Sequence, residues 1–146
     1  MTRFMMSLNE AVDLVLYAFN NAKSGELFVQ KAPGCTIKIL AESLINVLNL
    51  PDHPINIIGS RHGEKLHETL INKEEMASAI DLRDYYCLTP DNRDLNYSKY
   101  VEEGDLNIYK NDEYSSFNTN QLDIESMSLL LEDLDCIKKI KNHLRP

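Results

Sequence analysis

The chain has 146 residues, a hydrophobic content of 43% and a formal net charge of −8 at pH 7. This length suffices for one domain with a core, and the acidic balance excludes the broad basic surface that nucleic-acid binding requires. No apolar run reaches the roughly 18 to 20 residues of a membrane-spanning helix, and no secretory signal is present. Three separated cysteines, Cys35, Cys87 and Cys136, favour the reducing cytoplasm. We therefore expect a cytoplasmic protein. If its ligand is an anion, we expect the ligand to bind at a local cationic site, against the overall negative charge.

The first fifty residues predict two helices with a short strand between them. Ser7 and Glu10 have the spacing of a capping box at the start of a helix over about 8–22. Its broad apolar face must pack against a large partner. Residues 26–30 predict a strand, and Thr36 can cap a second helix that two prolines end. The apolar stripe is Leu8, Ala11, Val12, Val15, Leu16 and Phe19 in the first helix, and Ile37, Leu40, Ala41, Leu44, Ile45 and Leu48 in the second.

The middle of the chain continues this alternation of strands and helices. Residues 55–58 predict a strand and residues 64–71 a third helix, an order typical of α/β proteins. Weaker patterns predict a helical turn over 74–79 and a strand over 83–89. Residues 91–112 are polar and rich in turn formers, so we expect a loop there.

The C-terminal residues predict one long helix over about 123–142. Its acids come early and its bases late, which suits the helix macrodipole. We divide the chain into an α/β portion over 1–100, a loop or linker over 101–122, and a C-terminal helix and tail over 123–146. The expected buried stripe of the last helix is Met127, Leu130, Leu131, Leu134, Ile137 and Ile140.

The stretch IGSRHGEKLHE, residues 58–68, is the best candidate binding motif. Arg61 lies between a predicted strand and a predicted helix, at the kind of strand end where open α/β sheets bind ligands. Its planar fork suits a phosphate, and Gly63 lets the backbone approach closely. Glu64 could accept hydrogen bonds from a sugar hydroxyl or orient Arg61. The motif thus suits a phosphate joined to a polyol, and the alternative is a surface arginine paired with Glu64 or Glu68.

No complete active site is present in the sequence. The five glycines form no dinucleotide fingerprint, and no tyrosine has a lysine four residues later. Glu64 and His67 match half of a carboxylate di-iron signature that has to occur twice. We therefore assign no catalytic, cofactor-binding or metal-binding residue.

Four ordered motifs, residues 1–12, 28–33, 61–68 and 91–97, closely resemble one family. They are similar to the C-terminal part of bacterial capsular-polysaccharide nucleotide-sugar enzymes. These are extended short-chain dehydrogenase/reductases, described as UDP-N-acetylglucosamine 4,6-dehydratases or UDP-glucose 4-epimerases. The resemblance implies an α/β fold, namely the C-terminal substrate-binding portion of a Rossmann-type enzyme. It also implies that NAD(P) and the catalytic tyrosine–lysine pair belong to an N-terminal Rossmann domain that this chain lacks.

The resemblance further implies a UDP-sugar site. Arg3 and Arg61 match diphosphate ligands, Glu64 is similar to a residue near the nucleotide ribose, and Arg93 lies in a family motif without an assigned role. The chain would then be a truncated form that is inactive alone, or one half of a split enzyme that pairs with a separately encoded N-terminal half. The alternative class is a non-catalytic interaction module that uses the apolar stripe of the last helix.

Absence of a partner would leave the apolar face of the first helix exposed. Burying one Val, Leu or Phe side chain is worth roughly 1.5 to 3 kcal/mol, and a whole domain is stable by only about 5 to 15 kcal/mol. We therefore expect the isolated chain to be marginally stable, oligomeric or partly molten, with a sticky apolar surface.

Overall fold

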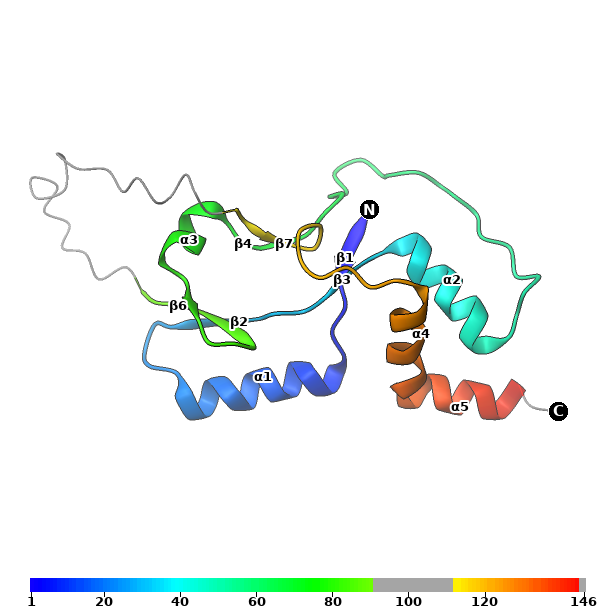
Figure 1. Ribbon diagram of the computed structural model, residues 1–146, viewed down its shortest axis with the longest axis horizontal. Helices are drawn as coiled ribbons and strands as arrows, with labels where there is room; N and C mark the ends of the chain where they lie inside the picture. The colour runs from blue at the N-terminus through cyan, green and yellow to red at the C-terminus, as the bar shows by residue number, and fades with distance from the viewer. Residues whose placement is uncertain (91–111, 145–146) are drawn as a thin grey trace, which may run out of the picture. The chain divides into compact units, whose positions relative to one another are not determined.

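The computed structural model describes residues 1–90 and 112–144, which form helices and short sheets (Figure 1). The predicted loop over 91–112 and the linker boundary at residue 101 lie almost wholly outside the described residues, as does Arg93. The chain packs into two compact units, each assembled from segments distant in sequence. Unit 1 comprises Met1–Ser7, Ala32–Glu68 and Ser116–Pro146, and unit 2 comprises Leu8–Lys31 and Thr69–Ser115.

Unit 1 begins with a small antiparallel sheet. Strand β1 (Thr2–Phe4) pairs with β3 (Gly34–Thr36), so that Arg3 lies opposite Cys35. Apart from an isolated parallel bridge at Gly34, the strands of the described residues pair antiparallel. The structure therefore mixes helices with short antiparallel sheets, which agrees with the expected α/β class at that coarse level.

Helix α2 (Ile37–Leu48) follows β3 directly. The Thr36 hydroxyl accepts a hydrogen bond from the Ile39 N–H at 3.1 Å, which confirms the predicted N-cap. Asn49 ends the helix in the left-handed conformation, with φ of 55°. The predicted stripe is only half-buried and Ile37 is exposed, whereas the fully buried positions of this helix are Ser43 and Val47.

The predicted long C-terminal helix is wrong in one respect, because the structure has two helices there. Helix α4 (Ile124–Asp133) ends at Leu134, whose ψ of 129° is extended, and α5 (Asp135–Leu144) follows. Asp123 caps α4 by accepting hydrogen bonds from the Ser126 hydroxyl at 2.7 Å and the Ser126 N–H at 2.8 Å. These bonds hold the pKa of the Asp123 carboxyl below its ordinary value.

The break has a geometric reason. Beyond Leu131 the apolar residues recur every three positions, and three residues advance a straight helix by about 300°, which is roughly 60° short of a full turn. The stripe would therefore drift away from the core. Breaking the helix at Leu134 lets Ile137 remain buried, while Ile140 is exposed. The core of unit 1 joins β3, α2, α4 and α5 through Cys35, Val47, Met127, Leu131 and Ile137.

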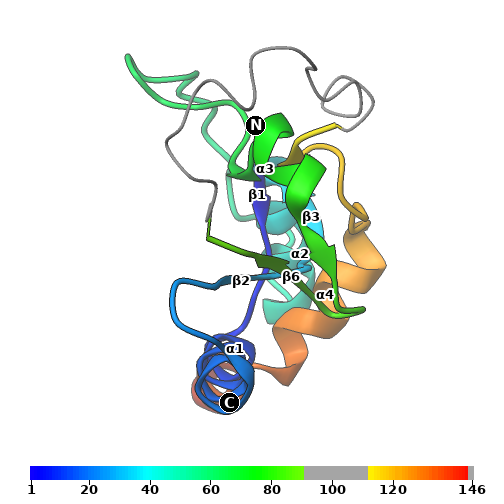
Figure 2. The ribbon, with the colours of Figure 1, turned by 90° about the vertical axis from the view of Figure 1, so that its left-hand side faces the viewer.

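Unit 2 is built on a three-stranded sheet with the order β2-β6-β5, and Figure 2 shows β2 beside β6. Strands β2 (Leu27–Gln30) and β6 (Tyr85–Leu88) lie within the two predicted segments and confirm them. The bounds of the other sheet and helix elements are β5 (Ile80–Asp81), β4 (Thr69–Ile71), β7 (Tyr114–Ser115) and α3 (Lys73–Ser78), the last confirming the predicted helical turn.

Two predicted elements are absent from the structure. Residues 55–58 form no strand, because nothing in the described residues supplies a partner for their backbone groups. Residues 64–71 form no helix. Their backbone groups bond to β1 and Ser116 instead, and residues 69–71 pair with β7 as strand β4. Tertiary hydrogen bonds thus replace the helical ladder that the local pattern favoured.

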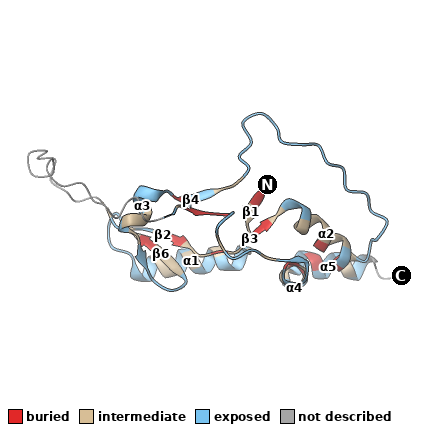
Figure 3. Ribbon diagram, turned by 45° about the horizontal axis from the view of Figure 1, so that its top comes forward, coloured by how far each residue is buried: buried red, intermediate tan, exposed pale blue. Residues whose placement is uncertain are grey.

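Helix α1 (Leu8–Asn21) confirms the first predicted helix, and its apolar stripe is exposed, as expected for a chain without a partner for this face. No residue of α1 is buried (Figure 3). Tyr17 attaches it to the sheet of unit 2, with ring centroids 5.6 Å from Phe28 and 4.3 Å from Tyr85. The predicted apolar residues Leu8 and Phe19 are 81% and 84% exposed. The remaining large members of that stripe, Val12, Val15 and Leu16, are also exposed.

We expect this exposed face to drive self-association. Replacing both Leu8 and Phe19 by serine should lower the weight-average mass at a given protein concentration, because both apolar side chains already contact solvent. Stability should hardly change, since neither side chain buries much surface. Sedimentation equilibrium measures the mass, and Leu129→Ser, at another exposed leucine, is the control. Unchanged association in the double variant would contradict the prediction.

No described helix is both long and apolar enough to cross a bilayer.

Candidate functional site

Arg3 is held by three contacts within unit 1. Its Nη1 donates a hydrogen bond to the Thr2 carbonyl at 2.7 Å, and its Nη2 donates to the Lys65 carbonyl at 3.1 Å. Its Nε lies 3.5 Å from Oε1 of Glu68. The side chain is 24% exposed, so the guanidinium is fixed and still reaches solvent. The structure therefore joins Arg3 to the segment that carries Arg61 and Glu64.

Residues 65–68 lie alongside β1. The Thr2 N–H donates to the Leu66 carbonyl at 2.9 Å, and the Phe4 N–H donates to Oε2 of Glu68 at 3.2 Å. Ser116 closes the other side, since its N–H donates to the Glu68 carbonyl at 2.7 Å and its hydroxyl accepts from the Glu68 N–H at 2.9 Å. Hydrogen bonds thus hold both the backbone and the carboxylate of Glu68.

A buried hydroxyl pair supports this arrangement. Thr2 Oγ1 lies 2.8 Å from His67 Nδ1 and 2.7 Å from Ser116 Oγ, and both hydroxyl residues are almost fully buried. The His67 ring packs against Phe117 at a centroid distance of 4.8 Å. Sequence reasoning missed this group because its members are 65 and 114 positions apart. Local patterns carry no signal for a contact of that kind.

Arg61 and Glu64 form a compact turn on the surface. The Glu64 N–H donates to the Arg61 carbonyl at 3.1 Å, and Oε2 of Glu64 accepts from the Arg61 N–H at 3.0 Å. Gly63 has a φ of 78°, which favours glycine. No carboxylate of the described residues pairs with the Arg61 guanidinium, so the alternative of an ion pair with Glu64 or Glu68 is not realised there.

The setting of Arg61 differs from the one that the sequence predicted. The residues before Arg61 form no strand and those after it form no helix, so neither the strand end nor the helix dipole is available. Arg61 is exposed, and its backbone N–H is already bonded to Glu64. What remains for an anion is the charged guanidinium itself, with its five donors.

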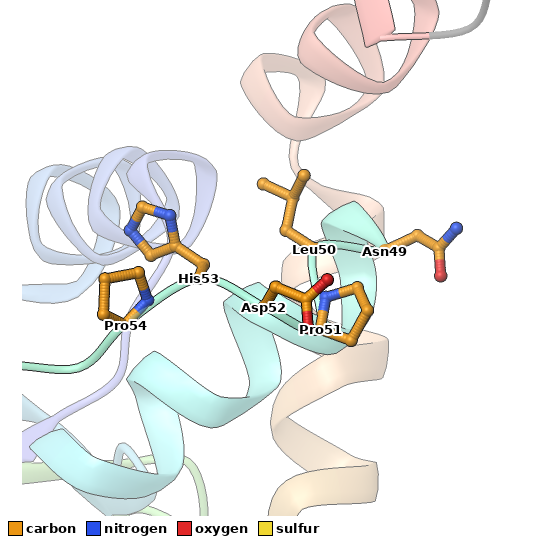
Figure 4. A pocket seen from close by; sticks show the side chains of 6 residues that line it. All are labelled: Asn49, Leu50, Pro51, Asp52, His53 and Pro54. Atoms are coloured by element: carbon orange, nitrogen blue, oxygen red, sulfur yellow. The ribbon is translucent and has the colours of Figure 1, made fainter.

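A shallow hollow of about 410 Å³ lies at the turn after α2, lined by Asn49, Leu50, Pro51, Asp52, His53 and Pro54 (Figure 4). Its charged side chain, that of Asp52, is acidic and would repel a phosphate. None of the predicted site residues, Arg3, Arg61 and Glu64, lines the hollow.

The start of α2 does not offer the phosphate cradle that binds a dinucleotide cofactor. A phosphate cradle needs a glycine turn open to the ligand before a helix, and Gly34 is the glycine nearest the start of α2. A Cβ at Gly34 would lie 2.3 Å from the Ser116 carbonyl oxygen, so the chain itself fills that space. At the start of α2, the Ile37 N–H donates to the Met1 carbonyl and the Ile39 N–H to Thr36. In the same described part of the chain, no three His, Cys, Asp or Glu side chains gather as metal ligands.

The described residues form a mixed α/β structure of helices and small sheets, in which Arg3 contacts Lys65 and Glu68 of the charged segment over 61–68. Two family models match the chain, the polysaccharide biosynthesis protein model over residues 1–90 and the polysaccharide biosynthesis protein C-terminal model over residues 91–138. The chain belongs to the polysaccharide biosynthesis protein family.

Curated relatives carry the name UDP-glucose 4-epimerase. The protein of Rickettsia rickettsii is 49% identical and that of Rickettsia felis is 46% identical, each over 143 residues that make up 97% of this chain. The chain spans 42% of the length of these relatives. The X-ray structure of Pen from Bacillus thuringiensis is 28% identical, with a TM-score of 0.71 over 92% of this chain and 38% of that one. These matches confirm the family resemblance and the mixed α/β fold.

Proposed function

We propose that this chain forms the nucleotide-sugar-binding segment of an enzyme that acts on UDP-sugars in the biosynthesis of surface polysaccharides. The observation that carries the proposal is the contact of Arg3 with the segment of Arg61 and Glu64, at Lys65 and Glu68. Two arginines with accessible guanidinium groups suit the two phosphates of a nucleoside diphosphate sugar. Glu64 is then the acceptor for a ribose hydroxyl.

Chemistry on the sugar would depend on parts that lie outside this segment. NAD(P) and the catalytic groups would belong to a Rossmann domain in the other part of the relatives' length, so we expect no turnover by this chain alone. The names of the relatives favour 4-epimerisation over 4,6-dehydration. The three free cysteines support a cytoplasmic location.

Thermal melting with and without a UDP-sugar tests this proposal. Ligand at about 100 times its dissociation constant adds roughly 2.7 kcal/mol of stability, and Tm should rise by several degrees. Arg61→Ala should remove most of this rise, because a hydrogen bond to a charged group is worth about 1.5 to 3 kcal/mol. In isothermal titration, Arg61→Ala should bind UDP about tenfold to hundredfold more weakly than the unchanged chain does.

Lys139→Ala is the matched control, since it removes one exposed positive charge from α5. Its binding should equal that of the unchanged chain. An equal loss of UDP affinity in Arg61→Ala and Lys139→Ala would mean that UDP binding depends only on the net charge of the chain. A melt that UDP-sugars do not shift at all would refute the binding function of this chain.

The alternative of an interaction module loses part of its basis. Its predicted contact was the apolar stripe of the last helix, but Met127, Leu131 and Ile137 are buried in the core of unit 1. A split enzyme remains compatible with the proposal. Activity that appears on mixing this chain with a separately produced N-terminal half of a relative would support it.

A further inference from the structure

The contacts of Arg3 leave a defined set of donors unused. A guanidinium carries five N–H groups. One on Nη1 is taken by the Thr2 carbonyl, one on Nη2 by the Lys65 carbonyl, and Nε faces Glu68. One N–H on each terminal nitrogen is not used by these contacts, and the side chain as a whole is 24% exposed. Two free N–H groups on one guanidinium can each donate a hydrogen bond to a phosphate oxygen.

Glu68 is the acidic partner in this arrangement, and it is itself fixed. Its Oε2 accepts the Phe4 N–H, and its backbone exchanges two hydrogen bonds with Ser116. The second oxygen, Oε1, faces Arg3. An arginine side chain loses much rotamer freedom on ordering. A partner that orders Arg3 before the ligand arrives reduces that cost at the moment of binding.

We propose that Glu68 is a positioning residue for the diphosphate of the nucleotide sugar and acts through Arg3. The inference rests on the proposed function above. The direction in which UDP affinity changes when the Glu68 charge is removed distinguishes this role from simple repulsion, because a carboxylate near a phosphate repels it directly. Simple electrostatics therefore requires that removal of the Glu68 charge strengthens UDP binding. Positioning requires the opposite.

The test is titration of the full chain and its Glu68→Gln variant with UDP and with uridine. Glutamine keeps an oxygen for the Phe4 N–H but loses the charge that holds Arg3. UDP binding should weaken roughly threefold to tenfold, which corresponds to the ordering of one long side chain. Uridine binding should not change, because uridine has no phosphate for Arg3. A general loss of fold would weaken both ligands.

A double-mutant cycle separates the route through Arg3 from other effects. In an Arg3→Ala background, Glu68→Gln should cause no further loss of UDP affinity. The control Glu74→Gln removes an exposed acid from α3 and should leave both affinities unchanged. Two results would overturn the role of Glu68 but leave the proposed function intact. One is equal or tighter UDP binding by Glu68→Gln, and the other is that the affinity losses of Arg3→Ala and Glu68→Gln are additive in the double variant. Failure of the unchanged chain to bind UDP would overturn the proposed function, and the diphosphate role of Glu68 with it.

Discussion

Met127→Ala should destabilise the chain by about 2 to 5 kcal/mol, which is the usual cost of truncating a buried methionine to alanine. Met127 is 1% exposed and packs in the core that joins β3, α2, α4 and α5. Few atoms can collapse into the space that its side chain leaves, since sheet bonds hold β3 and helix caps hold α2 and α4. The loss is large against a total of about 5 to 15 kcal/mol.

Urea denaturation followed by circular dichroism measures this change. The midpoint should fall without a change in slope if the variant still folds cooperatively. Leu129→Ala on the same helix is the control, because Leu129 is 64% exposed. It should cost only a few tenths of a kcal/mol. Similar losses for the two variants would mean that the predicted core does not form.

Gly34→Ala is expected to have a comparable effect for a different reason. A Cβ at this position would lie 2.3 Å from the Ser116 carbonyl oxygen and 2.6 Å from Nε2 of Gln121. Both neighbours are held, because Gln121 Nε2 donates to that carbonyl at 2.9 Å. The Gly34 backbone also bonds Asn120 and Leu122 at 2.8 Å each. Making room would break these bonds, and we expect a loss of roughly 3 kcal/mol.

Gly63→Ala is the comparison that separates the steric clash of an added Cβ from the cost of an unfavourable backbone conformation. A Cβ at Gly63 would meet nothing within 4 Å, but the φ of 78° disfavours alanine. Its expected cost is about 1 kcal/mol, from backbone conformation alone. Chemical denaturation of both variants gives the two values. A Gly34→Ala variant no less stable than Gly63→Ala would contradict the close approach of Ser116 to β3.

Local sequence was enough to predict many of the residues of the candidate site, but not which of them contact each other. The motif around Arg61 was identified because arginine, glycine and glutamate stand together in a few residues. Glu68 entered only as a possible partner of Arg61. In the structure it faces Arg3, a residue 65 positions earlier in the chain. No short-range pattern encodes that pairing.

The sequence by itself determined the elements whose signals are local. Thr36 and Asp123 stand where helix caps are needed, and both helices begin there. The family also followed from ordered motifs. Tertiary structure decided the rest. Residues 65–68 bond to β1 and Ser116 rather than form a helix, and the last helix breaks at Leu134 to keep Ile137 in the core. In each case backbone hydrogen bonds or apolar burial across distant segments outweigh local propensities, which are worth less than about 1 kcal/mol per residue.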